Sequence, residues 1–98
     1  MEKRTPHCKL PVVKSLIEPT KVRFTGSALS GAAGLGLDSS GIIDVVLTLN
    51  PRDFYKSMTT YGDHRVWQDV YKPIIPADEV CLKLTVTDDV LVVSFKEL

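Results

Sequence analysis

The segment from Asp53 to Tyr71, DFYKSMTTYGDHRVWQDVY, places aromatic rings among lysine, arginine and glutamine side chains. Aromatic rings can stack on the bases of a single-stranded nucleic acid, and fixed positive charges can hold its phosphates. The mixture therefore predicts a nucleic-acid surface, with Tyr55, Tyr71 and Arg65 as candidate contacts. The polar residues in this region and in the last strand that could do chemistry are Lys56, Gln68 and Lys96.

The first half of the chain carries helix signals. Apolar residues repeat with helical spacing across residues 10–17, and Pro19 is expected to end that helix. Residues 21–24 suit a short strand, and Thr25 suits the N-cap of a helix through residue 33. The β-branched run GIIDVVLTLN at 41–50 fits a strand as well as a helix, and we favour a helix. Residues 50–53 predict one more helical turn.

From Lys56 onward, apolar and polar residues alternate with the period of a β-strand. Residues 56–61 and 65–71 predict one hairpin, and residues 80–87 and 90–96 predict a second. In the second hairpin the expected apolar face consists of Val80, Leu82, Leu84, Val86, Leu91, Val93 and Phe95. The opposite, polar face carries Cys81, Lys83, Thr85, Thr87, Ser94 and Lys96. We expect an α+β fold in which N-terminal helices pack on one face of a C-terminal antiparallel sheet.

At 98 residues the chain is expected to form a single domain, spanning residues 1–98. Twelve basic and twelve acidic residues give zero net charge, which argues mildly against nucleic-acid binding, although a local patch can still attract an anion. Cys8 and Cys81 show neither zinc-ligand spacing nor a disulfide framework. Because the sequence shows no secretory signal and no apolar run that could span a bilayer, we expect a cytoplasmic protein with reduced thiols and no membrane partner.

The whole chain closely resembles the MqsR family, the RNA-cleaving toxins of bacterial type II toxin–antitoxin pairs. The resemblance is densest in DFYKSMTTY at 53–61, WQDVY at 67–71 and the last strand at 90–97. It implies a fold like that of RelE and YoeB, and ribosome-independent cleavage of mRNA at GCU-type sites. It also implies an MqsA-like antitoxin that carries zinc and a helix-turn-helix. Metal therefore belongs to the partner, and no cofactor is expected for this chain.

The same resemblance implies an active site of Lys56, Gln68, Lys96 and the residue at position 81. The family pattern has tyrosine at that position, whereas this chain has Cys81, which cannot stack on a base. For metal-free cleavage we expect Lys56 and Lys96 to lie close together and clamp the phosphate, and Gln68 to orient it. Cys81 is expected to be an auxiliary contact, with a neighbouring tyrosine supplying the aromatic surface.

Two other interpretations stay open. The cysteine at position 81 and the zero net charge are compatible with a weakened family member that still binds its antitoxin but no longer cuts RNA. A non-catalytic RNA-binding module would use the same sheet face. The sequence does not decide which residue acts as the general base and which as the general acid.

Overall fold

The computed structural model describes residues 1–17, 21–60, 62–75 and 78–98. The expectations placed on Pro19 and Tyr61 lie outside these residues. The helices of the structure are α1 (Leu10–Leu16), α2 (Gly26–Ala33), α3 (Ser39–Thr48) and the short 3₁₀ turn η1 (Pro51–Asp53). Its strands are β1 (Glu2–Lys3), β2 (Val22–Phe24), β3 (Phe54–Thr59), β4 (Trp67–Tyr71), β5 (Ile74–Ile75), β6 (Asp78–Val86) and β7 (Val90–Glu97). Within the described residues, none of the helices has the length and apolar character needed to cross a membrane.

Helices α2, α3 and η1 begin at capping side chains, whereas α1 begins after Lys9 without a side-chain cap and has a proline in its first turn. Thr25 Oγ1 accepts a hydrogen bond from the backbone N–H of Ala28 at 3.1 Å, which starts α2. The Asp38 carboxylate accepts the N–H of Gly41 at 2.9 Å and starts α3. A capping box between Asn50 and Asp53 starts η1. The helices expected at 10–17 and 25–33, the favoured helix at 41–50 and the turn at 50–53 are therefore confirmed.

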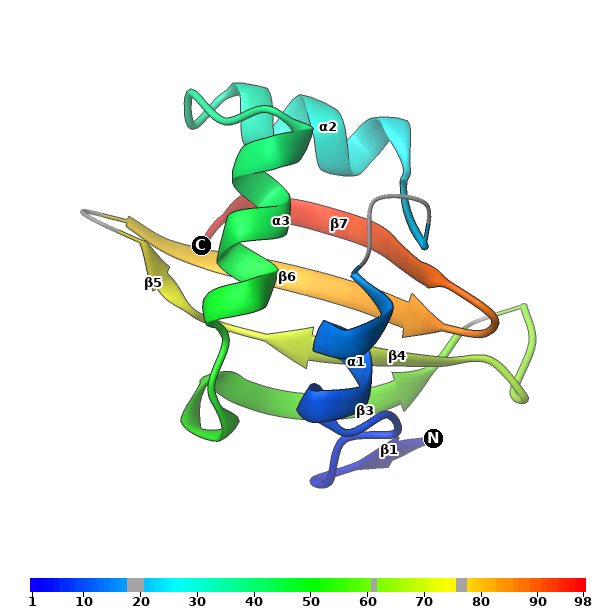
Figure 1. The fold of residues 1–98 in the computed structure, drawn as a ribbon. Coiled ribbons are helices and arrows are strands. Elements are labelled where there is room, and N and C mark those ends of the chain that lie inside the picture. Colours follow the sequence, from blue (N-terminus) through cyan, green and yellow to red (C-terminus); the bar gives the residue numbers. More distant parts are fainter. Residues whose placement is uncertain (18–20, 61, 76–77) are drawn as a thin grey trace.

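The main sheet has the strand order β1-β3-β4-β6-β7-β2, and β5 pairs with β6 beside this path (Figure 1). Both expected hairpins form, β3 with β4 and β6 with β7. Neighbouring strands are antiparallel except β2, which runs parallel to β7. The α+β class is confirmed, but the expectation of an antiparallel sheet is wrong at this edge. The parallel pairing was not predictable from local pattern, because β2 lies far from β7 in the sequence.

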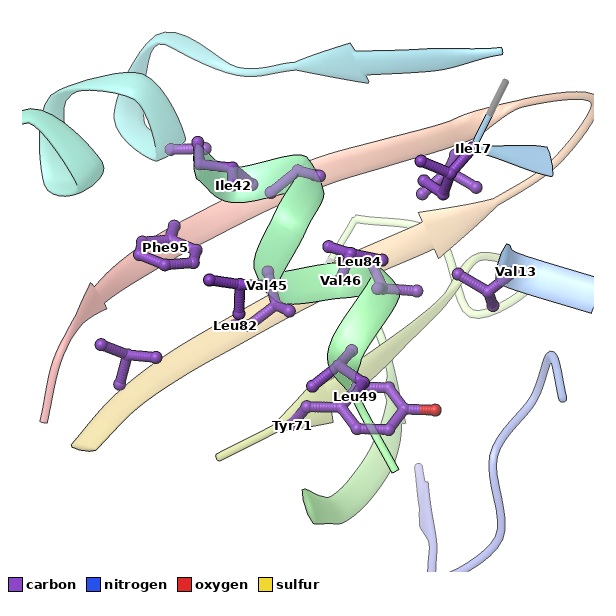
Figure 2. Packing of buried hydrophobic residues seen from close by; sticks show 14 of the residues in the cluster. Val13, Ile17, Ile42, Val45, Val46, Leu49, Tyr71, Leu82, Leu84 and Phe95 are labelled. Carbon is purple, nitrogen blue, oxygen red and sulfur yellow. The ribbon is translucent and has the colours of Figure 1, made fainter. Parts of the chain in front are cut away.

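One hydrophobic core joins the helices to one face of the sheet, which we call the core face (Figure 2). Helices α1, α2 and α3 all contribute to it, for example through Val13, Ala32 and Ile42. Strands β6 and β7 contribute Leu82 and Phe95, both fully buried. Burial of this apolar surface is the main stabilising term of a domain of this size.

The alternation expected for the last strand is wrong at two positions. Leu91 and Val93 are only half-buried, whereas Val90 and Val92 are fully buried in the core. The register between β6 and β7 shifts by one residue beside Val93, which is a β-bulge. Beyond the bulge the alternation changes phase, so Phe95 faces the core as expected.

Candidate active site

The second face of the sheet, which we call the open face, contributes no residue to the hydrophobic core cluster of the described residues. Residues directly opposite one another in register share a face, so the pairing fixes which side chains meet there. One row crosses four strands through Lys56, Val70, Lys83 and Ser94. A second row holds Glu2, Met58 and Gln68, and a third pairs Cys81 with Lys96. The four residues expected from the sequence to form the site thus lie on one face.

The expectation that Lys56 and Lys96 lie close together is wrong. They stand on β3 and β7, which are separated by β4 and β6. Three strand spacings of roughly 4.8 Å place these two strands about 14 Å apart. A phosphate bound between the two lysines would therefore lie over the middle of the open face.

Lys83 occupies that middle position, and the sequence reasoning did not select it. It lies opposite Val70 on one side and Ser94 on the other, and it is half-buried. It forms no ion pair with a carboxylate of the described residues. Strand alternation already assigned Lys83 to the polar face. What was missing was the strand order, which alone shows that this lysine sits between Lys56 and Lys96.

The Lys56 ammonium is paired with the carboxylate of Glu2. Their Nζ and Oε2 atoms are 3.1 Å apart, and the two side chains are 22% and 56% exposed. An ion pair this exposed is worth at most about 1 kcal/mol, so an incoming phosphate can replace the carboxylate. Gln68 lies beside this pair, where it lines a shallow groove with Glu2 and Met58. The groove thus presents an amide and a carboxylate, and that carboxylate is paired with the Lys56 ammonium.

Cys81 and Lys96 differ in accessibility although they lie opposite each other. Cys81 is 7% exposed, whereas Lys96 is exposed near the end of β7. A thiol that is almost covered offers little surface to a substrate. This geometry is consistent with the expected auxiliary role of Cys81.

Tyr71, which we expected to contact RNA, belongs to the core. It is fully buried within the core (Figure 2). Its ring packs edge to face against Phe54, with 5.4 Å between the ring centroids. Burial, together with the nearby charges of Asp69 and Cys8, raises the pKa of its hydroxyl far above the ordinary value. The ring offers no exposed face to a base, so the proposed contact is withdrawn.

Tyr55 is 41% exposed and lies among cations. A β-bulge between Phe54 and Lys56 interrupts the strand alternation at this residue. The Nζ atom of Lys72 is 3.7 Å from the centroid of the Tyr55 ring, that of Lys56 is 5.4 Å away, and Cζ of Arg4 is 5.7 Å away. We call these four residues the Tyr55 patch. Three cations around one ring repel each other, and a bound phosphate would relieve that repulsion.

Arg65 belongs neither to the rows of the open face nor to the Tyr55 patch. Its side chain is 90% exposed and its Nε lies 3.1 Å from Oδ1 of Asp63, in the connection between β3 and β4. Hydrogen bonds from the side chain and the backbone N–H of Arg65 hold the pKa of the Asp63 carboxyl below its usual value. The rows described above do not include Arg65, so any contact with RNA would lie outside them.

Comparison with known proteins identifies the family. Residues 5–97 match the family model described as motility quorum-sensing regulator, toxin of MqsA. The chain is also similar to the mRNA interferase toxin MqsR of Escherichia coli (strain K12), with 57% identity over 97 residues that cover 99% of each chain. The family match includes β3, β4, β6 and β7, the strands that carry the lysines and Gln68 of the open face, and it begins one residue after Arg4. The chain therefore belongs to the MqsR toxin family.

Proposed function

We propose that this chain is an endoribonuclease that cleaves mRNA on the open face of its sheet and acts as the toxin of a type II toxin–antitoxin pair. Membership of the MqsR family and the mRNA interferase activity named for its relative support this function. The observation that carries it is the register that aligns Lys56 and Lys83 in one row, with Gln68 and Lys96 in the rows beside it. We assign the fold to the RelE/YoeB type, in which helices cover one sheet face and RNA the other.

The proposed reaction is a metal-free transesterification. A base removes the proton of a ribose 2′-hydroxyl, and the oxygen attacks the adjacent phosphorus atom. The bond from phosphorus to the 5′-oxygen then breaks, and an acid protonates the departing oxygen. The products are a 2′,3′-cyclic phosphate and a 5′-hydroxyl. Negative charge grows on the phosphate during this step, so the cations of the site stabilise the transition state.

The residue roles follow from position on the open face. Lys83, at the centre, holds the scissile phosphate, and Lys56 and Lys96 bind the RNA on either side. The amide of Gln68 orients the phosphate or a base edge. Glu2, 3.1 Å from Lys56 Nζ, orients that lysine, and the general base is a side chain of the open face within hydrogen-bond reach of the 2′-hydroxyl. An ammonium group of the same face returns a proton to the leaving oxygen.

We further infer that cleavage is independent of the ribosome, favours GCU-type sites and takes place in the cytoplasm. The partner is an MqsA-like antitoxin with zinc and a helix-turn-helix, which the description of the family as the toxin of MqsA supports. The antitoxin would neutralise the toxin by extending the sheet or covering it. Strands β1 and β2 form the two ends of the main sheet, and an edge strand accepts main-chain hydrogen bonds from a partner.

A second candidate function is that of a weakened family member that binds antitoxin without cutting RNA. The observation that favours it is Cys81, which is 7% exposed where the family pattern has tyrosine. Cleavage by the purified chain would exclude this alternative.

Replacing each lysine of the open face by methionine tests the proposal, because methionine keeps the apolar stem and removes the charge. Lys83→Met is expected to lower kcat for cleavage of a defined RNA about 10²–10³-fold, the effect of removing one donor to a developing oxyanion. Lys56→Met and Lys96→Met should also weaken cleavage. The matched control is Lys14→Met, a lysine of helix α1 and not of the sheet. Unchanged cleavage in all three folded variants would remove this face from consideration.

A further inference from the structure

A cavity of about 380 Å³ lies where the N-terminal segment meets the beginnings of α1 and β3. Phe54 and Tyr71 line it with the edge-to-face ring pair described above. Pro6, Pro11 and Pro51 contribute further apolar lining, and their fixed backbone angles limit how far these walls can move. The volume falls within the range of roughly 300–1,000 Å³ that is typical of ligand sites.

The charged residues that line this cavity are both cations. Arg4 and Lys9 are exposed, and neither is ion-paired with a carboxylate in the part of the chain that the structure describes. An apolar, aromatic lining beside two free cations fits a ligand with a flat ring and a phosphate. A purely apolar ligand would leave the cations unused, and a small inorganic anion would leave the rings unused.

The cavity is continuous with the proposed reactive face. Arg4 lines the cavity and also belongs to the Tyr55 patch, where it lies 5.7 Å from the Tyr55 ring centroid. The Lys72 ammonium lies over the same ring, and Lys56 connects this patch to the row that contains Lys83. Positive charge therefore continues from the centre of the open face, around the edge of the sheet, to the cavity.

We propose that this cavity holds one unstacked nucleotide of the RNA substrate, beside the cleavage site, and thereby contributes to sequence preference. The base enters between the prolines and the half-buried ring of Phe54, behind which Tyr71 is fully buried, and its phosphate binds Arg4 and Lys9. This proposal rests on the proposed function, because it assumes that the substrate is single-stranded RNA. A peptide of the antitoxin is the competing occupant. The run of cations toward the reactive row favours RNA, whose phosphates repeat along such a path.

Two pairs of variants, at Lys9 and within α1, separate the effect of cavity shape from that of charge. Pro11→Phe fills the cavity, and its control, Val12→Phe, adds the same ring at the neighbouring exposed position outside it. Lys9→Gln removes a cation of the cavity, and Lys14→Gln removes one elsewhere on the helix. Far-UV circular dichroism and the unfolding midpoint of each variant establish that it is folded.

Binding is measured with a single-stranded RNA carrying 2′-O-methyl groups throughout, which cannot be cut by 2′-hydroxyl attack. Pro11→Phe is expected to weaken this binding about tenfold, within the range for loss of one stacked base. It should also relax base preference at one position beside the cut when a set of unmodified RNAs is cleaved. Lys9→Gln should weaken binding to all sequences and reduce its salt dependence. The two control variants should behave like the original chain.

The proposal is overturned if Pro11→Phe and Lys9→Gln bind and cleave every RNA as their controls do. It is also overturned if these variants lose affinity for the antitoxin alone. Because binding is measured without cleavage, the two proposals fail separately. RNA that binds in the cavity without being cut would support this inference and refute the endoribonuclease function. Normal cutting of every RNA by Pro11→Phe would support the endoribonuclease function and refute this inference.

Discussion

Asp69 anchors the N-terminal segment that brings Glu2 to the open face and Arg4 to the Tyr55 patch. Its side chain is 2% exposed, and its two carboxylate oxygens accept the backbone N–H groups of His7 at 2.9 Å and Cys8 at 3.0 Å. Asp69→Asn conserves size but turns an NH₂ group toward one of these donors. One hydrogen bond is then lost, and two donors face each other in a buried site.

The expected loss of stability follows from these contacts. A hydrogen bond to a charged group contributes about 1.5–3 kcal/mol, so Asp69→Asn should lower the free energy of unfolding by about 2–3 kcal/mol. In a domain of this size, 1 kcal/mol corresponds to roughly 4–8 °C in Tm, which predicts a fall of roughly 10–20 °C. The amides of His7 and Cys8 should exchange with solvent much faster than in the original chain.

Urea denaturation and hydrogen exchange at neutral pH measure both effects. The control is Asp44→Asn on α3, since Asp44 is exposed and accepts no side-chain hydrogen bond from the described residues. This control should change stability by no more than about 0.5 kcal/mol. The reasoning is refuted if Asp69→Asn is as stable as the control and keeps both amides protected.

Three further changes have defined outcomes. Cys81→Ser should leave RNA cleavage largely intact because the thiol is almost buried, and loss of activity in a folded variant would contradict its auxiliary role. Tyr71→Phe removes a buried hydroxyl without a partner among the described residues and should raise the free energy of unfolding by up to about 1 kcal/mol. The pKa of the Tyr71 hydroxyl is raised from 10.0, so its neutral form contributes stability that is present below pH 10 and lost as the pH rises further. Tyr71→Phe should therefore lose less stability in alkali than the original chain. Equal losses in the two proteins would argue against this. Gly31→Ala should lower the free energy of unfolding by about 1–3 kcal/mol or more, because the new Cβ would overlap the carbonyl oxygen of Phe95. The control is Gly26→Ala, whose Cβ would meet nothing within 4 Å. Equal Tm values for the two variants would refute the close packing of α2 on β7.

Much of the fold could be predicted because its signals are local. Thr25 and the pair Asn50 and Asp53 cap the helices that follow them, and a cap involves residues only three positions apart. The apolar alternation of β6 matches its burial at Val80, Leu82 and Leu84, but Cys81 and Thr85 of the expected polar face are also buried and Val86 is only half-buried. The bulge beside Val93 could not be predicted, because it depends on how β7 pairs with β6 and not on the residues of β7 alone. The edge strands β1 and β2 also depend on pairing with distant segments.

The candidate site shows the same division. The sequence placed Lys56, Gln68 and Lys96 in strands, and their pairing puts all three on one face. It did not reveal the central position of Lys83, since that follows from strand order. It also assigned Tyr71 to the surface, because a tyrosine in a strand fits either face. Only the register with Leu82 and Phe54 turns this ring into the core.

The central claim is that side chains of the open face cut RNA by proton transfer. The most direct test incubates the purified chain with a defined RNA, without ribosomes and with a metal chelator, and determines the chemistry of the new ends. Cleavage that leaves 2′,3′-cyclic phosphate and 5′-hydroxyl ends is the predicted result. Intact RNA, or ends with a 3′-hydroxyl and a 5′-phosphate, would contradict it.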